Sequence, residues 1–362
     1  MIECVFTIDY EIFGNGRGAL RQLVLEPTEE LMRVFAQANA PFVAFVEVAE
    51  LEMIAAHGTD EAIGAVENQV RRLRAQRHEV ALHLHPQWYN ARRQGDLWEL
   101  DYTEYNLCTL PNPRIREIID RALAYLRRLL SEPDFTPMSF RAGNWLFQPT
   151  KPVADVLVTS GIRIDSSVFK GGRQRSYGLD YRPARANSYY WTFCEDVNLA
   201  TPGPLLEIPI FTEQVPFWKM LKTKRIALQQ KAHPTPGSRN SRANRWLDFL
   251  RLRYPRKFDF CRMTFRELTG VVERVLQEDR LTPDTYKPLV AIGHSKDLND
   301  LDTVVHFLRW LRTNGIPVTT LQEAAARCQG LSTAISESKG LSEGHAVVPV
   351  SDIRQARARR KA

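Results

Sequence analysis

The chain has few cysteines and no long apolar segment. Five cysteines stand among its 362 residues, and none has the short pairwise spacing of a disulfide framework or a cysteine zinc site. No stretch approaches the roughly eighteen uninterrupted apolar residues that cross a membrane, and the first residues lack the basic and apolar segments of an export signal. We therefore expect a cytoplasmic protein without a transmembrane segment.

The composition is that of a soluble globular protein. Of the residues, 44% are hydrophobic and 25% are charged, which allows a large core. From about Gly330 the sequence loses every helical or strand periodicity and ends in an Arg-rich run. We expect one barrel-sized domain over residues 1–328, followed by a mobile basic tail over residues 329–362.

The formal charge of +7 is concentrated in two segments, one from Lys219 to Lys257 and one from Arg354 to Lys361. A solvated basic face or tail is the ordinary interpretation of such segments. The alternative is attraction to an anionic glycan, a nucleotide-linked sugar or a lipid headgroup, the last of which would give peripheral membrane contact. No nucleic-acid motif is present, so we expect no nucleic-acid partner.

Short apolar runs alternate with amphipathic stretches, which is typical of an α/β protein with a mostly parallel sheet. Strands are expected at residues 4–8, 42–46, 79–85, 138–140, 162–164, 205–210, 289–292 and 316–318. Helices are expected at residues 28–39, 62–77, 113–130, 152–159, 265–279 and 301–313, the first capped by Thr28. A segment over residues 170–205 lacks periodicity and is a candidate cap, and a basic insertion spans residues 215–260.

Two strand ends carry residues that bind metals. His83 and His85 stand two apart at the end of one apolar run, and Asp9 and Glu11 do the same at the end of the first run. Because side chains two apart in a strand share a face, each pair projects to one side. Imidazole and carboxylate ligands suit zinc or another first-row divalent ion. A structural histidine pair and a solvated acidic turn are the alternatives.

Further polar residues follow other apolar runs, and their joint placement favours a site. Arg141, Asp165 and His294 each stand at or just after a predicted strand. In parallel α/β sheets and barrels, functional side chains belong to the loops after strand carboxyl ends. Singly, Arg141 could form a surface ion pair and His294 could be an ordinary buried histidine.

The ordered set of motifs resembles a known family, the polysaccharide deacetylases of carbohydrate esterase family 4, in a divergent branch. The motifs are the segments at residues 6–11, 82–86, 140–145, 164–169 and 292–296. The resemblance covers about residues 2–325 and implies an irregular seven-stranded (β/α) barrel. It also implies metal-dependent hydrolysis of an N-acetyl group on a sugar or glycan precursor, which yields a free amine and acetate.

The resemblance also implies residue roles. Asp9 would be the general base, positioned by Arg141, and Glu11, His83 and His85 would hold the ion, expected to be Zn²⁺. His294 would be the general acid, oriented by Asp165. Two motifs depart from the family pattern: Tyr10 separates the two acids, and Gln87 stands where a later histidine is usual.

Substrate contacts are expected from Trp88, Trp145 and Lys296, which follow the same strand ends; packing and an ordinary loop cation are the alternatives for them. The expected partner is an N-acetylated sugar, free or linked to a nucleotide or lipid. Two alternatives stay open. The same barrel could hydrolyse another amide, such as a formamido sugar or a ureide, or the chain could be a sugar-binding relative without activity.

Overall fold

The computed structural model describes residues 1–95, 97–216 and 253–330. Most of the predicted basic insertion and nearly all of the predicted tail therefore lie outside the described residues. The chain divides into two units, residues 1–325 and 326–362. Every element and side chain discussed below belongs to the first unit.

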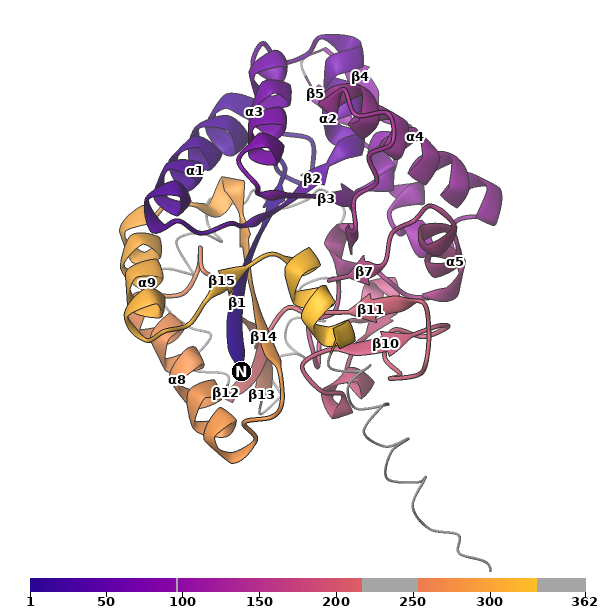
Figure 1. Ribbon diagram of the computed structural model, residues 1–362. Helices are drawn as coiled ribbons and strands as arrows, with labels where there is room; N and C mark the ends of the chain where they lie inside the picture. Colours follow the sequence, from indigo (N-terminus) through magenta and orange to yellow (C-terminus); the bar gives the residue numbers. More distant parts are fainter. Residues whose placement is uncertain (96, 217–252, 331–362) are drawn as a thin grey trace, which may run out of the picture. The chain divides into compact units, whose positions relative to one another are not determined.

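The core of this unit is a curled sheet whose neighbouring strands are parallel. Seven strands follow one another in the order β11, β7, β6, β3, β2, β1 and β14, and every neighbouring pair in this run is parallel. Figure 1 shows these strands inside a set of helices. The seven parallel strands confirm the predicted barrel class.

The strands are short toward the β10 end of the sheet and long toward the β14 end. Their bounds are β1 Ile2–Tyr10, β2 Val43–Glu47, β3 Glu79–Leu84, β6 Ser139–Ala142, β7 Ile164–Asp165, β10 Trp191–Phe193, β11 Leu205–Glu207, β14 Lys287–His294 and β15 Val318–Thr319. The edge strand β10 pairs antiparallel with β11, and β15 pairs with β1. Strands β1, β2, β3 and β14 are buried along their whole length, so their sequences are nearly continuous apolar runs.

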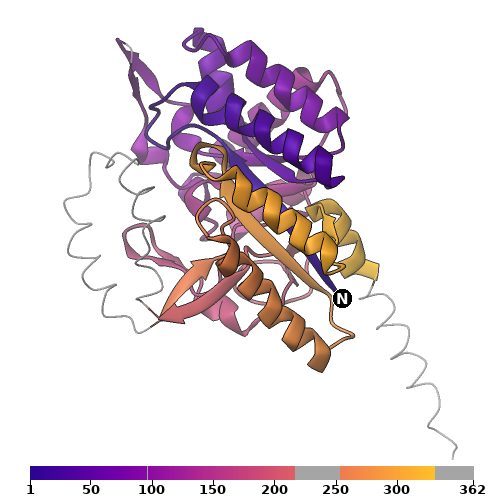
Figure 2. The ribbon, with the colours of Figure 1, turned by 90° about the vertical axis from the view of Figure 1, so that its left-hand side faces the viewer.

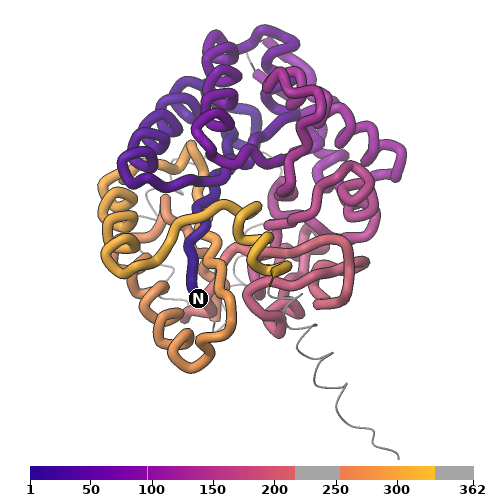
Figure 3. Tube along the Cα trace, in the orientation of Figure 1, coloured from indigo at the N-terminus to yellow at the C-terminus, as the bar shows by residue number. Residues whose placement is uncertain are grey.

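Backbone contacts join the two ends of the curled sheet. The segment after β11 reaches β14 through a parallel bridge between Ile210 and Val290, and it reaches the segment after β7 through a bridge between Ile210 and Phe169. The amide of Phe211 donates to the carbonyl of Val290 over 3.0 Å. The Cα trace in Figure 3 shows β1 beside β14, so the first strand of the chain lies next to a late one.

Within the described residues, three small two-stranded antiparallel sheets accompany the main sheet. They are β4 Arg92–Gln94 with β5 Leu97–Glu99, β8 Arg173–Gln174 with β9 Leu179–Asp180, and β12 Thr212–Pro216 with β13 Arg253–Lys257. The second lies in the segment predicted as a cap, and the third brackets the basic run.

The helices lie between successive strands and bury one face each. Their bounds are α1 Glu26–Ala38, α2 Val48–His57, α3 Ile63–Ala75, α4 Asn112–Leu130, α5 Lys151–Thr159, α8 Phe265–Leu281 and α9 Leu301–Thr313. Figure 2 shows α1, α9 and α8 side by side along one flank. Within the described ranges, no helix has the length and apolarity needed to cross a bilayer.

Two local predictions differ from the structure. Thr28 does not cap its helix, because a π-helical turn at Arg21–Leu25 leads directly into α1 and places Thr28 inside it. The helix α2 follows β2 without a loop and was not predicted, since its apolar first half continues the apolar strand. At the start of α8, Thr264 and Glu267 form a capping box, which stabilises that helix end.

Candidate functional site

The parallel register brings the predicted site residues to one end of the sheet. Asp9 of β1 pairs with His294 of β14, and His83 of β3 pairs with Arg141 of β6. All four stand at the carboxyl ends of their strands, where a parallel sheet gathers its functional groups. Residues separated by more than 280 positions in the sequence are therefore neighbours in space.

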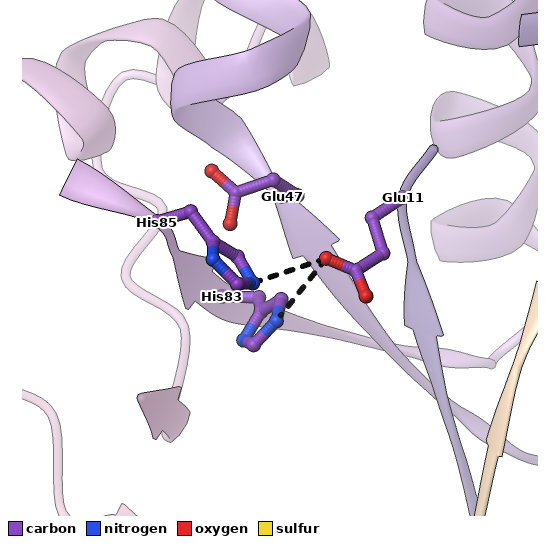
Figure 4. A group of neighbouring side chains, drawn as sticks. All are labelled: Glu11, Glu47, His83 and His85. Carbon is purple, nitrogen blue, oxygen red and sulfur yellow. Dashed lines mark ion pairs between the residues drawn. The ribbon is translucent and has the colours of Figure 1, made fainter. Parts of the chain in front are cut away.

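Glu11, His83 and His85 converge on one point, as Figure 4 shows. The Glu11 Oε2 atom lies 3.1 Å from His85 Nε2 and 3.7 Å from His83 Nε2. All three side chains are almost completely buried. The predicted metal ligands are therefore close enough to share one ion.

Glu47, at the carboxyl end of β2, joins this group. One donor atom from each of Glu11, Glu47, His83 and His85 lies within 4.8 Å of the other three. Glu47 has no exposed surface, its Oε2 atom has no hydrogen-bond partner among the described residues, and Figure 4 shows its carboxylate beside the imidazole of His85. A buried carboxylate oxygen without a partner is costly, so this atom fits a cation that would bind it.

The outer nitrogens of both imidazoles are held by neighbouring groups. His83 Nδ1 lies 2.8 Å from the carbonyl of Arg141, which only accepts, so Nδ1 carries the proton and Nε2 is the atom that faces Glu11. His85 Nδ1 lies 3.1 Å from the Gln87 amide and 3.2 Å from the Asn144 amide. Such partners fix the ring orientation of metal-binding histidines.

The amide oxygen of Gln87 is available to accept a hydrogen bond from His85. Its Oε1 is buried without a partner, whereas its Nε2 faces His85 Nδ1. Amide orientations are assigned from the hydrogen-bond network, and turning this amide would offer Oε1 to a protonated Nδ1. His85 Nε2 would then be free to bind an ion.

Asp9 lies between a cation and an imidazole. Its Oδ1 accepts from Arg141 Nη1 over 2.6 Å, and its Oδ2 lies 3.3 Å from His294 Nε2. Arg141 is itself fully buried; it also donates to the carbonyl of Ser166 and to Thr7 Oγ1. The guanidinium is therefore fixed, and it fixes the carboxylate of Asp9.

Charge and burial oppose each other at the two acids of β1. Burial acts to raise the pKa of Asp9, but the charges of Arg141, His83 and His294 outweigh it and hold that pKa below its usual value. Burial acts in the same way on Glu11, and Lys296 with the two imidazoles holds its pKa well below the usual range. Both acids are therefore ionised at neutral pH.

The carboxylate that faces the Nδ1 atom of His294 belongs to Asp297 and not to Asp165. His294 Nδ1 lies 3.8 Å from Asp297 Oδ2, and burial lowers the pKa of His294 although the charges of Asp9 and Asp297 act to raise it. Asp165 instead accepts from the hydroxyl and amide of Ser167. The predicted partnership of Asp165 with His294 is therefore wrong.

Asp165 fails as the partner of His294 because it sits deeper, in register with Phe140 and Glu207 rather than at the rim. Burial raises the pKa of Asp165, and burial together with Asp165 raises the pKa of Glu207 well above its usual value. These two acids lie close enough to interact, and one proton shared between them relieves their repulsion.

The three predicted substrate contacts differ in their surroundings. Trp88 is buried against Trp98, with ring centroids 5.4 Å apart, so it packs the core and offers no open face. Lys296 donates to Glu11 Oε1 over 2.7 Å and to the carbonyl of Ile12, so it is already paired. Trp145 is half-buried, and its indole meets the His294 ring edge-on with centroids 6.1 Å apart.

Two site residues, Glu47 and Asp297, are absent from the sequence prediction. Glu47 directly follows the apolar run at residues 42–46, so the strand-end rule that selected Asp9 and His83 would also have selected it. Asp297 stands three residues after His294, in a 3₁₀ turn at Ser295–Asp297. No periodicity in the sequence reveals the second contact.

No protein-family model and no curated protein matches the sequence. Among solved structures, a putative polysaccharide deacetylase from Mycobacterium smegmatis is similar, with a TM-score of 0.50 at 15% identity and 91% coverage of both chains.

Two other solved structures fall slightly below that similarity. A probable polysaccharide deacetylase from Pseudomonas aeruginosa PAO1 has a TM-score of 0.49 at 12% identity, with 90% of each chain covered. An allantoinase has a TM-score of 0.48 at 14% identity, with coverage of 90% of this chain and 89% of the other. At such identities the similarity concerns the fold: this chain has the curled parallel barrel of the polysaccharide deacetylase type, as its motifs predicted.

Proposed function

We propose that this protein is a metal-dependent amide hydrolase that removes the acetyl group from an N-acetylated sugar. The observation that carries the proposal is the convergence of Glu11, His83 and His85 beside the Asp9 carboxylate and the His294 imidazole. One cluster of ligands, one base and one acid are the groups that amide hydrolysis requires.

The residues fit a divalent ion, and Glu11, His83, His85 and Glu47 would hold it. Two imidazoles with carboxylate oxygen form a donor set that suits Zn²⁺. The Oε2 atom of Glu47, which has no hydrogen-bond partner among the described residues, favours a cation at this point. The acceptor atoms of Glu11 and His83 face each other, which also favours a cation between them. When bound, the ion lowers the pKa of a water molecule and polarises the amide carbonyl.

Asp9 is suited to the role of general base. It is ionised because of Arg141, and Arg141 leaves Oδ2 directed toward His294. A carboxylate held in one orientation can accept the proton of the attacking water without reorganising. Arg141 acts through Asp9 and is a positioning residue.

His294 is suited to the role of general acid. Its Nε2 atom faces Asp9, and its Nδ1 atom faces Asp297, which stabilises the imidazolium form. Protonated His294 donates its Nε2 proton to the departing amine, and the proton that Asp9 takes from water can pass over 3.3 Å to His294 Nε2 and restore it. The C–N bond breaks as the nitrogen gains this proton, so the proton balance closes.

The substrate in this proposal is an N-acetylated sugar or glycan precursor, and forms linked to a nucleotide or lipid belong to the same class. Trp145, beside His294, supports a sugar because the face of an indole packs against the apolar face of a pyranose ring. We expect the reaction to release acetate and a free sugar amine.

The test is incubation of the Zn²⁺-loaded protein with a panel of N-acetylated sugars, their nucleotide-linked forms and N-formyl analogues, with acetate or formate and free amine measured. We expect acetate release that a chelator stops and that Asp9→Asn and His294→Ala reduce strongly. Full turnover by both variants would contradict the assigned roles. Release of formate alone would identify the acyl group as formyl.

A further inference from the structure

Lys257 is a lysine of the site that the proposed chemistry does not use. It ends strand β13, and the segment after it runs beside β14, where Phe258 and Phe260 exchange backbone hydrogen bonds with Ile292. Ile292 stands two residues before His294. The fold therefore delivers Lys257 to the carboxyl end of the sheet from outside the seven parallel strands.

The amine of Lys257 lies over two aromatic rings. Its Nζ atom lies 2.8 Å from the ring centroid of Trp145 and 4.6 Å from that of Phe169. The two rings meet edge-on, with centroids 5.7 Å apart. The same indole also meets His294, so Trp145 lies in contact with both Lys257 and the proposed general acid.

Trp145 is fixed in place for this contact. It and Asn144 adopt positive φ angles of 60° and 55°, a backbone conformation that is strained for residues with a side chain. The carbonyl of Trp145 accepts from the hydroxyl of Tyr181 over 2.7 Å, which secures the turn. Strain of this kind is retained where a side chain must point in one direction.

Lys257 differs from the other cations at this end of the sheet because it lacks an anionic partner. Arg141 pairs with Asp9 at 2.6 Å, Lys296 pairs with Glu11 at 2.7 Å, and Arg262 pairs with Asp297 at 2.5 Å. Among the described residues, Lys257 Nζ has neither a hydrogen bond nor an ion pair. Aromatic faces attract an ammonium but do not replace the acceptors that water gives it.

The electrostatic environment of Lys257 agrees with a missing hydrogen-bond acceptor at its amine. Burial and the charge of Arg262 lower its pKa well below the usual value, against the opposing charges of Asp259 and Asp9, while Arg141 adds to the lowering. An anion bound at Lys257 Nζ would supply both a negative charge beside the amine and hydrogen-bond acceptor atoms for it.

We propose that Lys257 binds an anionic group of the substrate, so that the preferred substrate is a sugar carrying a phosphate or a carboxylate in addition to its acylated amine. Trp145 would hold the ring of that sugar next to His294, and Lys257 would hold its anion. The sugar part of this inference rests on the proposed function, whereas the binding of an anion by Lys257 does not.

The test is isothermal titration of the full-length protein with three ligands: N-acetylglucosamine, N-acetylglucosamine 1-phosphate and N-acetylglucosaminuronic acid. A charged hydrogen bond strengthens binding by roughly 10- to 100-fold, so we expect wild type to prefer an anionic ligand by at least about tenfold. The two anionic ligands distinguish phosphate from carboxylate.

Variants assign the preference to Lys257. We expect Lys257→Met to bind both kinds of sugar equally and Lys257→Arg to retain most of the preference. Lys170→Met is a matched control, because Lys170 also lies over an indole, that of Trp191, but donates to the carbonyls of Asn187 and Ser188. Each variant is first checked by thermal unfolding.

The outcomes separate this inference from the proposed function. A wild-type protein without anion preference, or a Lys257→Met variant that keeps it, would overturn the inference. Acetate release from neutral sugars alone would overturn the inference and leave the deacetylase intact. If the protein binds anions through Lys257 but hydrolyses no amide, the inference stands and the proposed function is overturned.

Discussion

The two ends of strand β3 carry buried histidines in opposite situations. At the amino end, His78 Nδ1 accepts from the amide of Phe42 over 3.2 Å, and its ring packs on that of Phe42 at 4.0 Å. At the carboxyl end, His83 and His85 both face the carboxylate of Glu11. The first histidine completes a hydrogen-bond network, and the other two present nitrogens to a shared point.

The same contrast holds for the charged groups around the two ends of the sheet. At the amino end, Lys287 donates to Asp279 and to two carbonyls, and Glu79 accepts from Ser139 and from the amide of Gln322. At the carboxyl end, Glu47 Oε2 and His294 Nδ1 lack hydrogen-bond partners. Satisfied buried groups stabilise a fold, whereas unsatisfied ones that gather at the carboxyl end of a parallel sheet fit a place where an ion or ligand binds.

The largest expected difference between the two ends concerns turnover. Asp9→Asn keeps an acceptor for Arg141 but cannot take a proton, so we expect kcat to fall roughly 10³-fold. Glu79→Gln, at the other end of the sheet, should leave kcat unchanged and lower the free energy of unfolding by about 1–3 kcal/mol. Steady-state kinetics and urea unfolding check the pair, and equal kinetic losses in both variants would remove the contrast.

Metal content should divide the histidines of β3 in the same way. We expect the wild type to hold one equivalent of Zn²⁺ and His83→Ala to lose it, because one of the converging donors is removed. His78→Ala should retain it, since its imidazole faces the Phe42 backbone. Elemental analysis after dialysis against Zn²⁺ measures both, and a zinc-free His78→Ala protein that is still folded would count against the site.

The stability of the fold at acid pH should depend on His78, which lies at the amino end of the sheet. Burial lowers the pKa of His78 to about 4, below the value of about 6.5 in an unfolded chain. Between these values the unfolded chain binds a proton that the folded protein does not, so stability is fully present above pH 6.5 and declines as the pH falls toward 4.

Between pH 7 and pH 4 the free energy of unfolding should fall in both proteins. We expect the fall in His78→Asn to be smaller than that in the wild type by up to about 3 kcal/mol. Urea unfolding at the two pH values gives this difference directly. An identical decline in both proteins would mean that His78 contributes nothing to the acid sensitivity.

The smallest predicted effect distinguishes Asp297 from Asp165 by their influence on the pKa of His294. Asp297 acts to raise the pKa of His294, so its removal should lower that pKa further. The general acid then loses its proton at lower pH, and we expect Asp297→Asn to shift the alkaline limb of the kcat profile to lower pH, with roughly a tenfold loss at neutral pH. Asp165→Asn should leave that limb in place, and a shift in both would return Asp165 to its predicted role.

The sequence was sufficient for the elements with strong periodicity. The predicted helix at residues 301–313 coincides with α9, and those at 113–130 and 152–159 agree with α4 and α5 to within one residue. The mostly parallel sheet also followed from the alternation of strands and helices, whereas the barrel was predicted from the resemblance of the motifs to a family. Local hydrophobic patterns dictate these features, so they are visible without knowledge of tertiary contacts.

The site was predictable as far as strand ends reveal it. Glu11, His83 and His85 meet as predicted because parallel register aligns the carboxyl ends of β1 and β3 through β2. The partner of His294 was not predictable, because it depends on the path of a short turn that places Asp297 opposite Nδ1. Likewise, the packing of Trp88 and the pairing of Lys296 with Glu11 depend on tertiary neighbours.

The most direct measurement is the anomalous-scattering map of crystals grown with Zn²⁺. We predict one zinc ion bound by Glu11, His83 and His85 at about 2.0–2.2 Å from each donor atom, with Glu47 as an additional ligand. A fully zinc-exposed crystal with these four side chains in place and no ion between them would contradict the account.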